Sequence, residues 1–206
     1  MKIGILGTGR IGSALGKRWA DAGHALCFGS RELARAAALA GEVGHGAQGG
    51  SYADAAAFGE AVLLAVPWSA AAEVLGTLQG ALAGKLLLDA TNNLSGDSSG
   101  GPSAVQVQAW ASGAYVVKAF NTVFFQILDS SWRAGTGPRP AVFMVGDDAN
   151  AKQIAAPLIA DAGFEPLDSG TLAQAGDIDV LARFIIHLGY DQGLGPHIAY
   201  GLLRLP

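Results

Sequence analysis

The chain has 206 residues, of which 50% are hydrophobic and 15% are charged, and its formal net charge is −4. This composition supplies enough apolar side chains for one well-filled α/β domain and argues against a disordered chain. Because the sequence contains no basic stripe, we expect neither a nucleic acid nor an anionic membrane surface as a partner.

Short apolar runs of strand length alternate with Ala-rich stretches of helical spacing. This alternation predicts an α/β fold of the Rossmann type, in which helices cover both faces of a doubly wound, mostly parallel sheet. Strands are expected at residues 2–7, 25–29, 42–46, 61–66, 85–89, 114–118, 141–146 and 164–167. Helices are expected at residues 11–22, 32–39, 69–78, 104–111 and 149–161, followed by a helical region from about Leu172. Gly-rich or Pro-rich loops are expected at residues 95–103 and 129–140.

The expected Rossmann domain covers residues 1–170, and residues 171–206 form a short C-terminal helical extension that is not an independent domain. The extension mixes aromatic and aliphatic side chains with several glycines. We expect it to act as a lid or dimer contact, with the segment from about Phe184 to Leu203 packed against the partner subunit of a homodimer. The alternative is a monomer in which the extension folds back over its own sheet.

Because Cys27 is the only cysteine, an intrachain disulfide is excluded. Its place in an expected buried strand favours a core residue over a redox-active thiol. The N-terminus enters a strand without a signal-peptide pattern, and no apolar run reaches the roughly 20 residues of a membrane-spanning helix. We therefore expect a cytoplasmic protein with no membrane partner. The 4 histidines lack metal-ligand spacing, so no metal site is predicted.

The first expected strand leads into a glycine-rich run, Gly7-Thr8-Gly9-Arg10-Ile11-Gly12, and then into an amphipathic helix. In this arrangement glycines permit a tight turn, and backbone N–H groups at the helix N-terminus face a pyrophosphate. We therefore predict that these six residues bind a dinucleotide. The alternative is an ordinary strand-to-helix turn with no ligand.

The end of the second expected strand indicates which dinucleotide is bound. An NAD-binding domain usually carries Asp or Glu about 20 residues after the turn, where the carboxylate binds ribose hydroxyls. This chain has Ser30 and Arg31 instead, with Arg35 one helical turn later. Because a hydroxyl and guanidinium groups suit a 2′-phosphate, we predict NADP(H), with Glu32 as a helix-start residue that points away. The alternative for the two arginines is a solvated helix face.

Ligands of an open parallel sheet lie beyond the carboxyl ends of its strands. The residues expected there beside the nicotinamide and its ribose are Val66, Pro67, Trp68, Ala90, Thr91 and Asn92. Trp68 has the alternative role of a core or interface aromatic.

The end of the sixth expected strand carries the two candidates for orienting an acceptor, Asn121 and Lys118. No residue is assigned as an acid or base, and a structural ion pair is the alternative role of Lys118. Tyr115 and Lys118 do not form a catalytic Tyr–Lys pair, because their odd offset on a strand directs the side chains to opposite faces.

Several separated motifs carry a resemblance to a known family: Gly7-Thr8-Gly9-x-x-Gly12, Gly29-Ser30-Arg31 with Arg35, Val66-Pro67-Trp68, Lys118-Ala119-Phe120-Asn121-Thr122, Gly146-Asp147-Asp148 and Leu172-Ala173-Gln174. Over essentially its whole length the chain resembles the NADPH-dependent reductases of the coenzyme F-420 (deazaflavin) type. Its Rossmann unit is also similar to the oxidoreductase domain of membrane ferric reductases and to the N-terminal half of pyrroline-carboxylate reductases. The resemblance implies that the first three motifs bind the cofactor.

We predict an NADP(H)-dependent oxidoreductase that transfers hydride between NADPH and a planar redox cofactor, either the deazaflavin coenzyme F-420 or a flavin. The short extension favours a planar acceptor, because it cannot build the large substrate pocket of reductases for small imines or hydroxy acids. Direct hydride transfer needs positioning and exclusion of water, so no catalytic triad is expected. Two alternatives remain: a reductase of a small carbonyl, imine or metal chelate, and a non-catalytic NADP(H) redox sensor.

Overall fold

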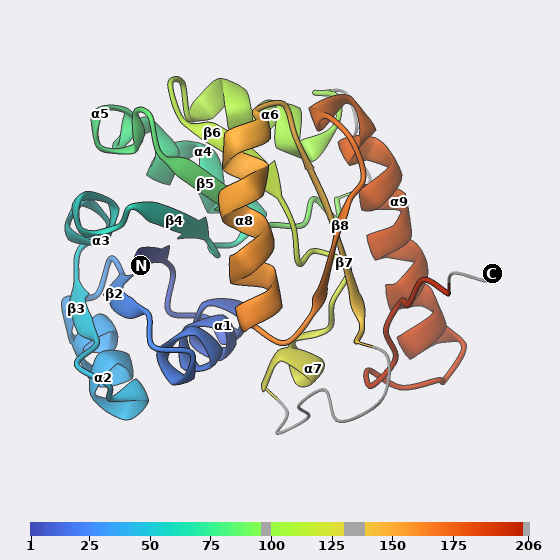
Figure 1. The fold of residues 1–206 in the computed structure, drawn as a ribbon, viewed down its shortest axis with the longest axis horizontal. Coiled ribbons are helices and arrows are strands. Elements are labelled where there is room, and N and C mark those ends of the chain that lie inside the picture. The colour runs from blue at the N-terminus through green and yellow to red at the C-terminus, as the bar shows by residue number, and fades with distance from the viewer. Residues whose placement is uncertain (96–99, 130–138, 204–206) are drawn as a thin grey trace.

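The computed structural model describes residues 1–95, 100–129 and 139–203. These residues form an eight-stranded sheet with the order β3-β2-β1-β4-β5-β6-β7-β8 (Figure 1). The strands are β1 (Lys2–Leu6), β2 (Ala25–Gly29), β3 (Gln48–Gly50), β4 (Ala61–Leu64), β5 (Leu86–Asp89), β6 (Tyr115–Lys118), β7 (Ala141–Gly146) and β8 (Glu165–Asp168). The helices are α1 (Arg10–Asp21), α2 (Leu33–Val43), α3 (Tyr52–Phe58), α4 (Trp68–Gly76), α5 (Gln79–Leu82), α6 (Ser103–Trp110), α7 (Phe125–Asp129), α8 (Ala149–Asp161) and α9 (Ala175–Ile186). A 3-10 turn, η1 (Leu172–Gln174), precedes α9, and a π-helical turn, η2 (His187–Asp191), follows it.

The sheet is parallel from β3 to β6 and between β7 and β8, whereas β6 and β7 are antiparallel. This arrangement confirms the predicted Rossmann-type, mostly parallel sheet. The chain leaves β1 towards β2 on one side and later leaves β4, the other neighbour of β1, towards β5. Connections therefore diverge between the carboxyl ends of β1 and β4, which is where such sheets bind ligands.

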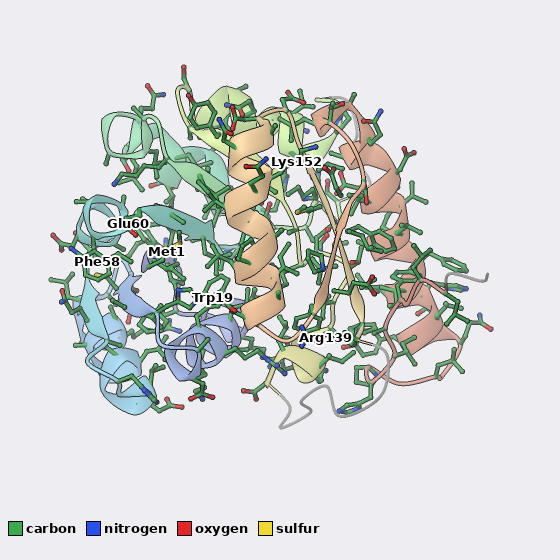
Figure 2. All side chains as sticks on the ribbon, in the orientation of Figure 1. Met1, Trp19, Phe58, Glu60, Arg139 and Lys152 are labelled. Carbon is green, nitrogen blue, oxygen red and sulfur yellow. The ribbon has the colours of Figure 1, made fainter. Side chains whose placement is uncertain are left out.

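Both faces of the sheet are buried under helices. One apolar layer includes residues of α1, α2 and α8, and the other includes residues of α3, α4 and α6. Trp19 lies between α1 and α8 (Figure 2), and its Nε1 donates to the Leu158 carbonyl at 2.8 Å. Burial on both faces explains why strands such as β4 and β7 are continuous apolar runs in the sequence.

The expected strand at residues 42–46 is wrong. Helix α2 continues to Val43, and a turn follows in which Gly44 and Gly46 have φ angles of 70° and 72°. His45, expected at the end of that strand, lies in this turn. The third strand is Gln48–Gly50. Positive φ angles favour glycine, so the two glycines end the helix and separate it from the strand.

Residues 96–99 of the first expected loop (95–103) and residues 130–138 of the second (129–140) lie outside the described residues. Of their described ends, Ser103 begins α6 and Asp129 ends α7. The expected C-terminal helical region is present as η1, α9 and η2.

Candidate active site

The turn between β1 and α1 needs two of its glycines for its own packing. Gly7 has a φ angle of 122°, and a Cβ atom on it would lie 2.4 Å from the Ala65 carbonyl oxygen. A Cβ atom on Gly12 would lie 2.4 Å from the carbonyl oxygen of Gly7. Gly9 differs, because a Cβ atom there would meet nothing within 4 Å. Gly9 therefore faces open space in front of the helix N-terminus.

The N-terminus of α1 has the properties of an anion site. Gly9 is the N-cap residue, and no side chain caps the helix. Backbone N–H groups of the first turn are thus free of a side-chain acceptor, and the helix dipole adds positive potential there. Arg10, the first residue of the helix, is exposed, and its guanidinium lies 4.5 Å from the ring centroid of Phe125.

The end of β2 places a buried hydroxyl and two exposed arginines together. Ser30 is buried, and its Oγ accepts from the backbone N–H of Glu32 at 3.2 Å. Glu32 is the N-cap residue of α2, at the helix start where it was expected, and its Oε1 lies 3.7 Å from Nη1 of Arg35. Arg31 is exposed and has no ion pair within the described residues. It is therefore the more available cation.

A cleft of about 520 Å³ opens at the carboxyl ends of β1, β4, β5 and β6. It brings together ten of the predicted site residues: Gly9, Arg10, Ile11, Val66, Pro67, Trp68, Ala90, Thr91, Asn92 and Asn121. A smaller hollow of about 340 Å³ is lined by Thr8, Gly9, Arg10, Ser13, Lys17, Phe125 and Asp129. The two hollows share Gly9 and the stacked pair Arg10–Phe125. Lys118, Ser30 and the remaining predicted residues do not line the large cleft.

The segment between β6 and α7, where the sequence analysis placed Asn121, forms one wall of the cleft. Phe120 is buried with a φ angle of 67°, a left-handed conformation that is uncommon for an aromatic residue. The next two residues, Asn121 and Thr122, are 5% and 2% exposed. Asn121 Oδ1 and Thr122 Oγ1 have no hydrogen-bond partner within the described chain. Backbone strain and unpaired buried polar atoms are features that cluster at binding sites.

The C-terminal extension supplies the facing wall. Ile185 and Ile186 of α9 and Tyr190 of η2 line the cleft. The Tyr190 ring packs edge-on against Phe124, with centroids 5.4 Å apart. A Cβ atom on Gly189 would lie 2.7 Å from the Phe124 ring, so glycine permits this close approach.

The extension also packs against its own chain. The monomeric alternative to the homodimer requires such a contact. Tyr200 accepts at its carbonyl from the N–H of Ala141 and donates from its hydroxyl to the Leu181 carbonyl. Phe184 and Leu203 are nevertheless 51% and 80% exposed. The homodimer remains a prediction.

Trp68 packs against an apolar layer and also borders the cleft, and its contact with a cofactor stays a prediction. Its ring lies 5.0 Å from that of Trp110, at an interplanar angle of 47°, and it also lines the cleft. The first residue of β6, Tyr115, is exposed, whereas Lys118 is fully buried. The two side chains therefore lie in different surroundings, as their odd offset predicts.

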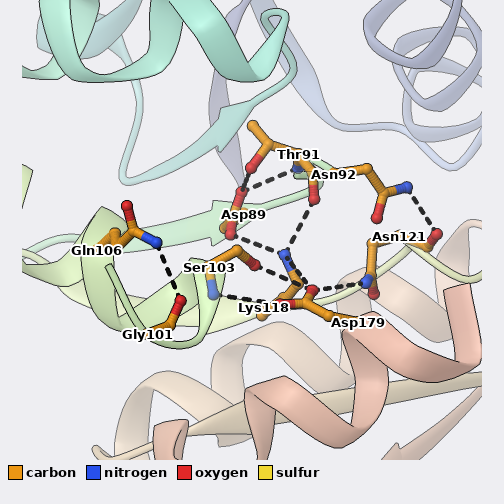
Figure 3. Close-up of polar contacts among 9 residues, drawn as sticks. All are labelled: Asp89, Thr91, Asn92, Gly101, Ser103, Gln106, Lys118, Asn121 and Asp179. Atoms are coloured by element: carbon orange, nitrogen blue, oxygen red, sulfur yellow. Dashed lines mark hydrogen bonds and ion pairs between the residues drawn. The ribbon is translucent and has the colours of Figure 1, made fainter. Parts of the chain in front are cut away.

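A buried ion cluster lies beside the cleft (Figure 3). Lys118 Nζ lies 3.2 Å from Asp89 Oδ2 and 3.6 Å from Asp179 Oδ1, and it donates to the Thr91 carbonyl at 2.9 Å. Lys118 thus forms the ion pair that was the alternative to orienting an acceptor. Asp179, on α9, was not singled out in the sequence, because a single Asp in a helix carries no signal of a distant partner.

Three further observations concern the described part of the chain. Cys27 is buried, and burial raises the pKa of its thiol, as in an unreactive core cysteine. Within residues 1–95, 100–129 and 139–203, no cluster of His, Cys, Asp and Glu side chains is suited to a metal ion. No helix of these residues is long and apolar enough to cross a membrane.

Comparisons with known proteins point to the same cofactor class. Residues 2–93 match the family described as NADP oxidoreductase, coenzyme F420-dependent. The F420-dependent NADP reductase of Methanothermobacter marburgensis is 31% identical over 212 residues, which cover 91% of this chain and 92% of that protein. The metalloreductase STEAP3 of Rattus norvegicus is 30% identical over 87% of this chain, but the chain spans only 36% of that protein. A provisionally assigned F420-dependent NADP reductase from Arthrobacter sp. FB24 has a TM-score of 0.83 at 28% identity, with 99% of this chain and 100% of that chain covered.

Proposed function

Because this chain belongs to the family of coenzyme F420-dependent NADP oxidoreductases, we propose that its cleft holds NADP(H) against a planar redox cofactor and lets hydride pass between them. The acceptor is a deazaflavin of the coenzyme F420 type or a flavin. The observation that carries this proposal is the shape of the cleft, which runs from the glycine turn to the C-terminal extension. A flat ring beside the nicotinamide fits such a cleft better than a small substrate that needs an acid or base.

The residues of the cleft, together with those at the end of β2, fit NADP(H) as the cofactor. The glycine turn and the uncapped N-terminus of α1 would hold the pyrophosphate, with open space in front of Gly9. Ser30, Arg31 and Arg35 would hold the 2′-phosphate. The strand ends at Val66–Trp68 and Ala90–Asn92 would flank the nicotinamide and its ribose, and the unpaired atoms of Asn121 and Thr122 offer further hydrogen bonds.

NADPH, when bound, supplies the hydride from its nicotinamide ring. The protein orients the two rings and keeps water away from them, and it takes no part in a proton transfer. The aliphatic residues Ile185 and Ile186 and the buried ring of Phe124 exclude water from the inner part of the cleft. Asn92 Nδ2 donates to the Asn121 carbonyl at 2.9 Å and so ties the end of β5 to the end of β6. This tie keeps the floor of the cleft rigid, as orientation of two rings requires.

A comparison of acceptors tests the proposed reaction. The protein is mixed with NADPH and with coenzyme F420, FMN or FAD, and the absorbances of nicotinamide and acceptor are followed. We expect NADPH to be consumed with at least one planar acceptor, in step with reduction of that acceptor. Tight nucleotide binding without turnover on any of them would favour a redox sensor, and turnover only with small carbonyls, imines or metal chelates would favour the other reductase class.

Replacing Arg31 by alanine is expected to lower the affinity for NADPH by about one to two orders of magnitude. The affinity for NADH should be almost unchanged. A charge-assisted phosphate contact is worth about 1.5–3 kcal/mol, and only NADPH carries the 2′-phosphate. Titration calorimetry with both nucleotides measures the effect. Arg35→Ala is the matched comparison, and its smaller expected loss reflects the contact of Arg35 with Glu32. Equal weakening of NADPH and NADH by Arg31→Ala would contradict its assignment to the phosphate.

A further inference from the structure

The buried ion cluster beside the cleft carries one negative charge in excess. It consists of two carboxylates, Asp89 and Asp179, around one ammonium, Lys118. Asp89 and Lys118 have side chains with no exposed surface, and the Asp179 side chain is 11% exposed. Water therefore screens this charge much less than it screens a charge at the surface.

Both carboxylates accept hydrogen bonds from neighbouring N–H and O–H groups. Asp89 Oδ1 accepts from the N–H of Thr91 at 2.9 Å and from its hydroxyl at 2.6 Å. Asp179 accepts from the N–H of Ser103 at 3.1 Å and from its hydroxyl at 3.0 Å (Figure 3). Such contacts suit ionised carboxylates, which are acceptors only. Two negative charges and one positive charge leave a formal charge of −1.

The cluster reaches the floor of the cleft through two residues. Thr91 lines the cleft and is bonded directly to Asp89. Asn121 also lines the cleft, and its Nδ2 lies 3.5 Å from Asp179 Oδ1. Of the residues that line the large cleft, Arg10 is the charged one, and it lies at the glycine turn. The cluster therefore contributes a negative potential at the inner end of the cleft.

We propose that the Asp89–Lys118–Asp179 cluster makes this cleft prefer the oxidised nicotinamide ring to the reduced one. This inference rests on the proposed function, because it requires the nicotinamide to lie over Thr91 and Asn121. The oxidised ring carries a positive charge and the reduced ring is neutral, whereas the rest of the nucleotide is the same in both. An excess negative charge below the ring stabilises only the cation. The bound pair is thereby biased towards NADPH as the hydride donor.

Charge-removing substitutions separate this role from a structural one. The preference is measured as the dissociation constant of NADPH divided by that of NADP⁺, from calorimetric titrations at one salt concentration. Asp179→Asn keeps the shape of the side chain and leaves the cluster neutral, and we expect it to lower the preference about tenfold. Asp89→Asn is expected to act in the same direction. Asp177→Asn is the control, because Asp177 lies exposed in the first turn of the same helix. The ratio of dissociation constants of this variant should equal that of the wild type.

The ratio distinguishes the possible outcomes. A fall in preference for Asp179→Asn or Asp89→Asn, beside an unchanged control, supports the proposal. Equal weakening of both nucleotides, or no change in either, would show that the cluster is only structural. Circular dichroism identifies a variant that does not fold, in which case the other one decides. A wild-type protein that binds neither nucleotide would overturn the proposed function itself, which is a different result from an unchanged ratio.

Discussion

Replacing Gly9 by valine is expected to reduce the affinity for NADPH and NADP⁺ about a hundredfold while the protein stays folded. Gly9 has extended backbone angles that valine adopts readily, and its Cβ atom would meet nothing within 4 Å. The open space in front of it is where backbone N–H groups would approach the pyrophosphate, and a branched side chain would fill that space. A hundredfold loss corresponds to about 2.7 kcal/mol of binding free energy.

The comparison between binding and stability makes this result specific. Valine is a poorer N-cap residue than glycine, so the free energy of unfolding should fall by no more than about 1 kcal/mol. Gly76→Val is the matched control, because Gly76 also has open space around its Cβ position but lies at the end of α4, and nucleotide affinity should not change. Calorimetric titration and thermal unfolding measure both quantities. Wild-type affinity in a folded Gly9→Val protein would place the pyrophosphate elsewhere.

The strands that could be predicted are those whose apolar runs are bounded by turn residues. β2 and β7 have the expected bounds, because each is an apolar run that ends at a glycine. The failure at residues 42–46 has a physical cause: the Ala-rich helix α2 continues further than its apolar spacing suggests, and the strand behind it, Gln48–Gly50, has no apolar side chain. Such an edge strand is defined by its pairing with β2, which is a tertiary contact.

The short helices show which signals were present and overlooked. Helix α3 begins with a capping box, in which Ser51 accepts from the N–H of Asp54 and Asp54 accepts from the N–H of Ser51. A Ser followed three residues later by an acidic residue is a readable helix start. Helix α7 has no such signal, because it has only five residues and is held by its contacts with α1.

The part of the cleft formed by the strand ends could be predicted from the sequence. The part formed by the C-terminal extension could not. The rule that ligands lie beyond strand ends located Val66, Thr91 and Asn121 from sequence alone. Tyr190 and Asp179 reach the site from the C-terminal extension, and no local pattern reports a contact between segments so far apart in the chain. The expectation for Lys118 left two roles open, and the ion pair with Asp89 became visible only when β5 and β6 were paired.

The second large effect is a loss of stability, expected when the buried Arg18 is replaced. Arg18 contacts α7, the helix that begins at the cleft. Arg18 is 4% exposed, and its guanidinium donates to the backbone carbonyls of Leu128 at 2.6 Å, Ala162 at 2.8 Å and Ile127 at 2.9 Å. It also lies 5.5 Å from the centroid of the Phe164 ring. These contacts join α1 to the end of α7 and to the turn between α8 and β8. Helix α7 begins at a cleft residue, so the same contacts support one wall of the site.

Arg18→Met is therefore expected to lower the free energy of unfolding by about 4 kcal/mol. Methionine fills the apolar part of the space but donates no hydrogen bond, and each buried carbonyl that loses the Arg18 donor costs about 1–3 kcal/mol, with partial relaxation between neighbours. For a chain of this length the loss corresponds to a fall in melting temperature of roughly 10 °C. Thermal unfolding followed by circular dichroism measures it.

The preceding residue provides the control for this prediction. Lys17 lies on the same helix but is 41% exposed, and its ion pair with Glu42 is a surface contact worth at most about 1 kcal/mol. Lys17→Met should shift the melting temperature by no more than about 3 °C. If Arg18→Met shifted it no further than Lys17→Met, the three carbonyls would have found other donors, and α7 would not depend on Arg18. If the expected loss is found, Arg18→Met should also weaken nucleotide binding near Phe125, because the hydrogen bonds from Arg18 to Ile127 and Leu128 support the helix that begins at Phe125.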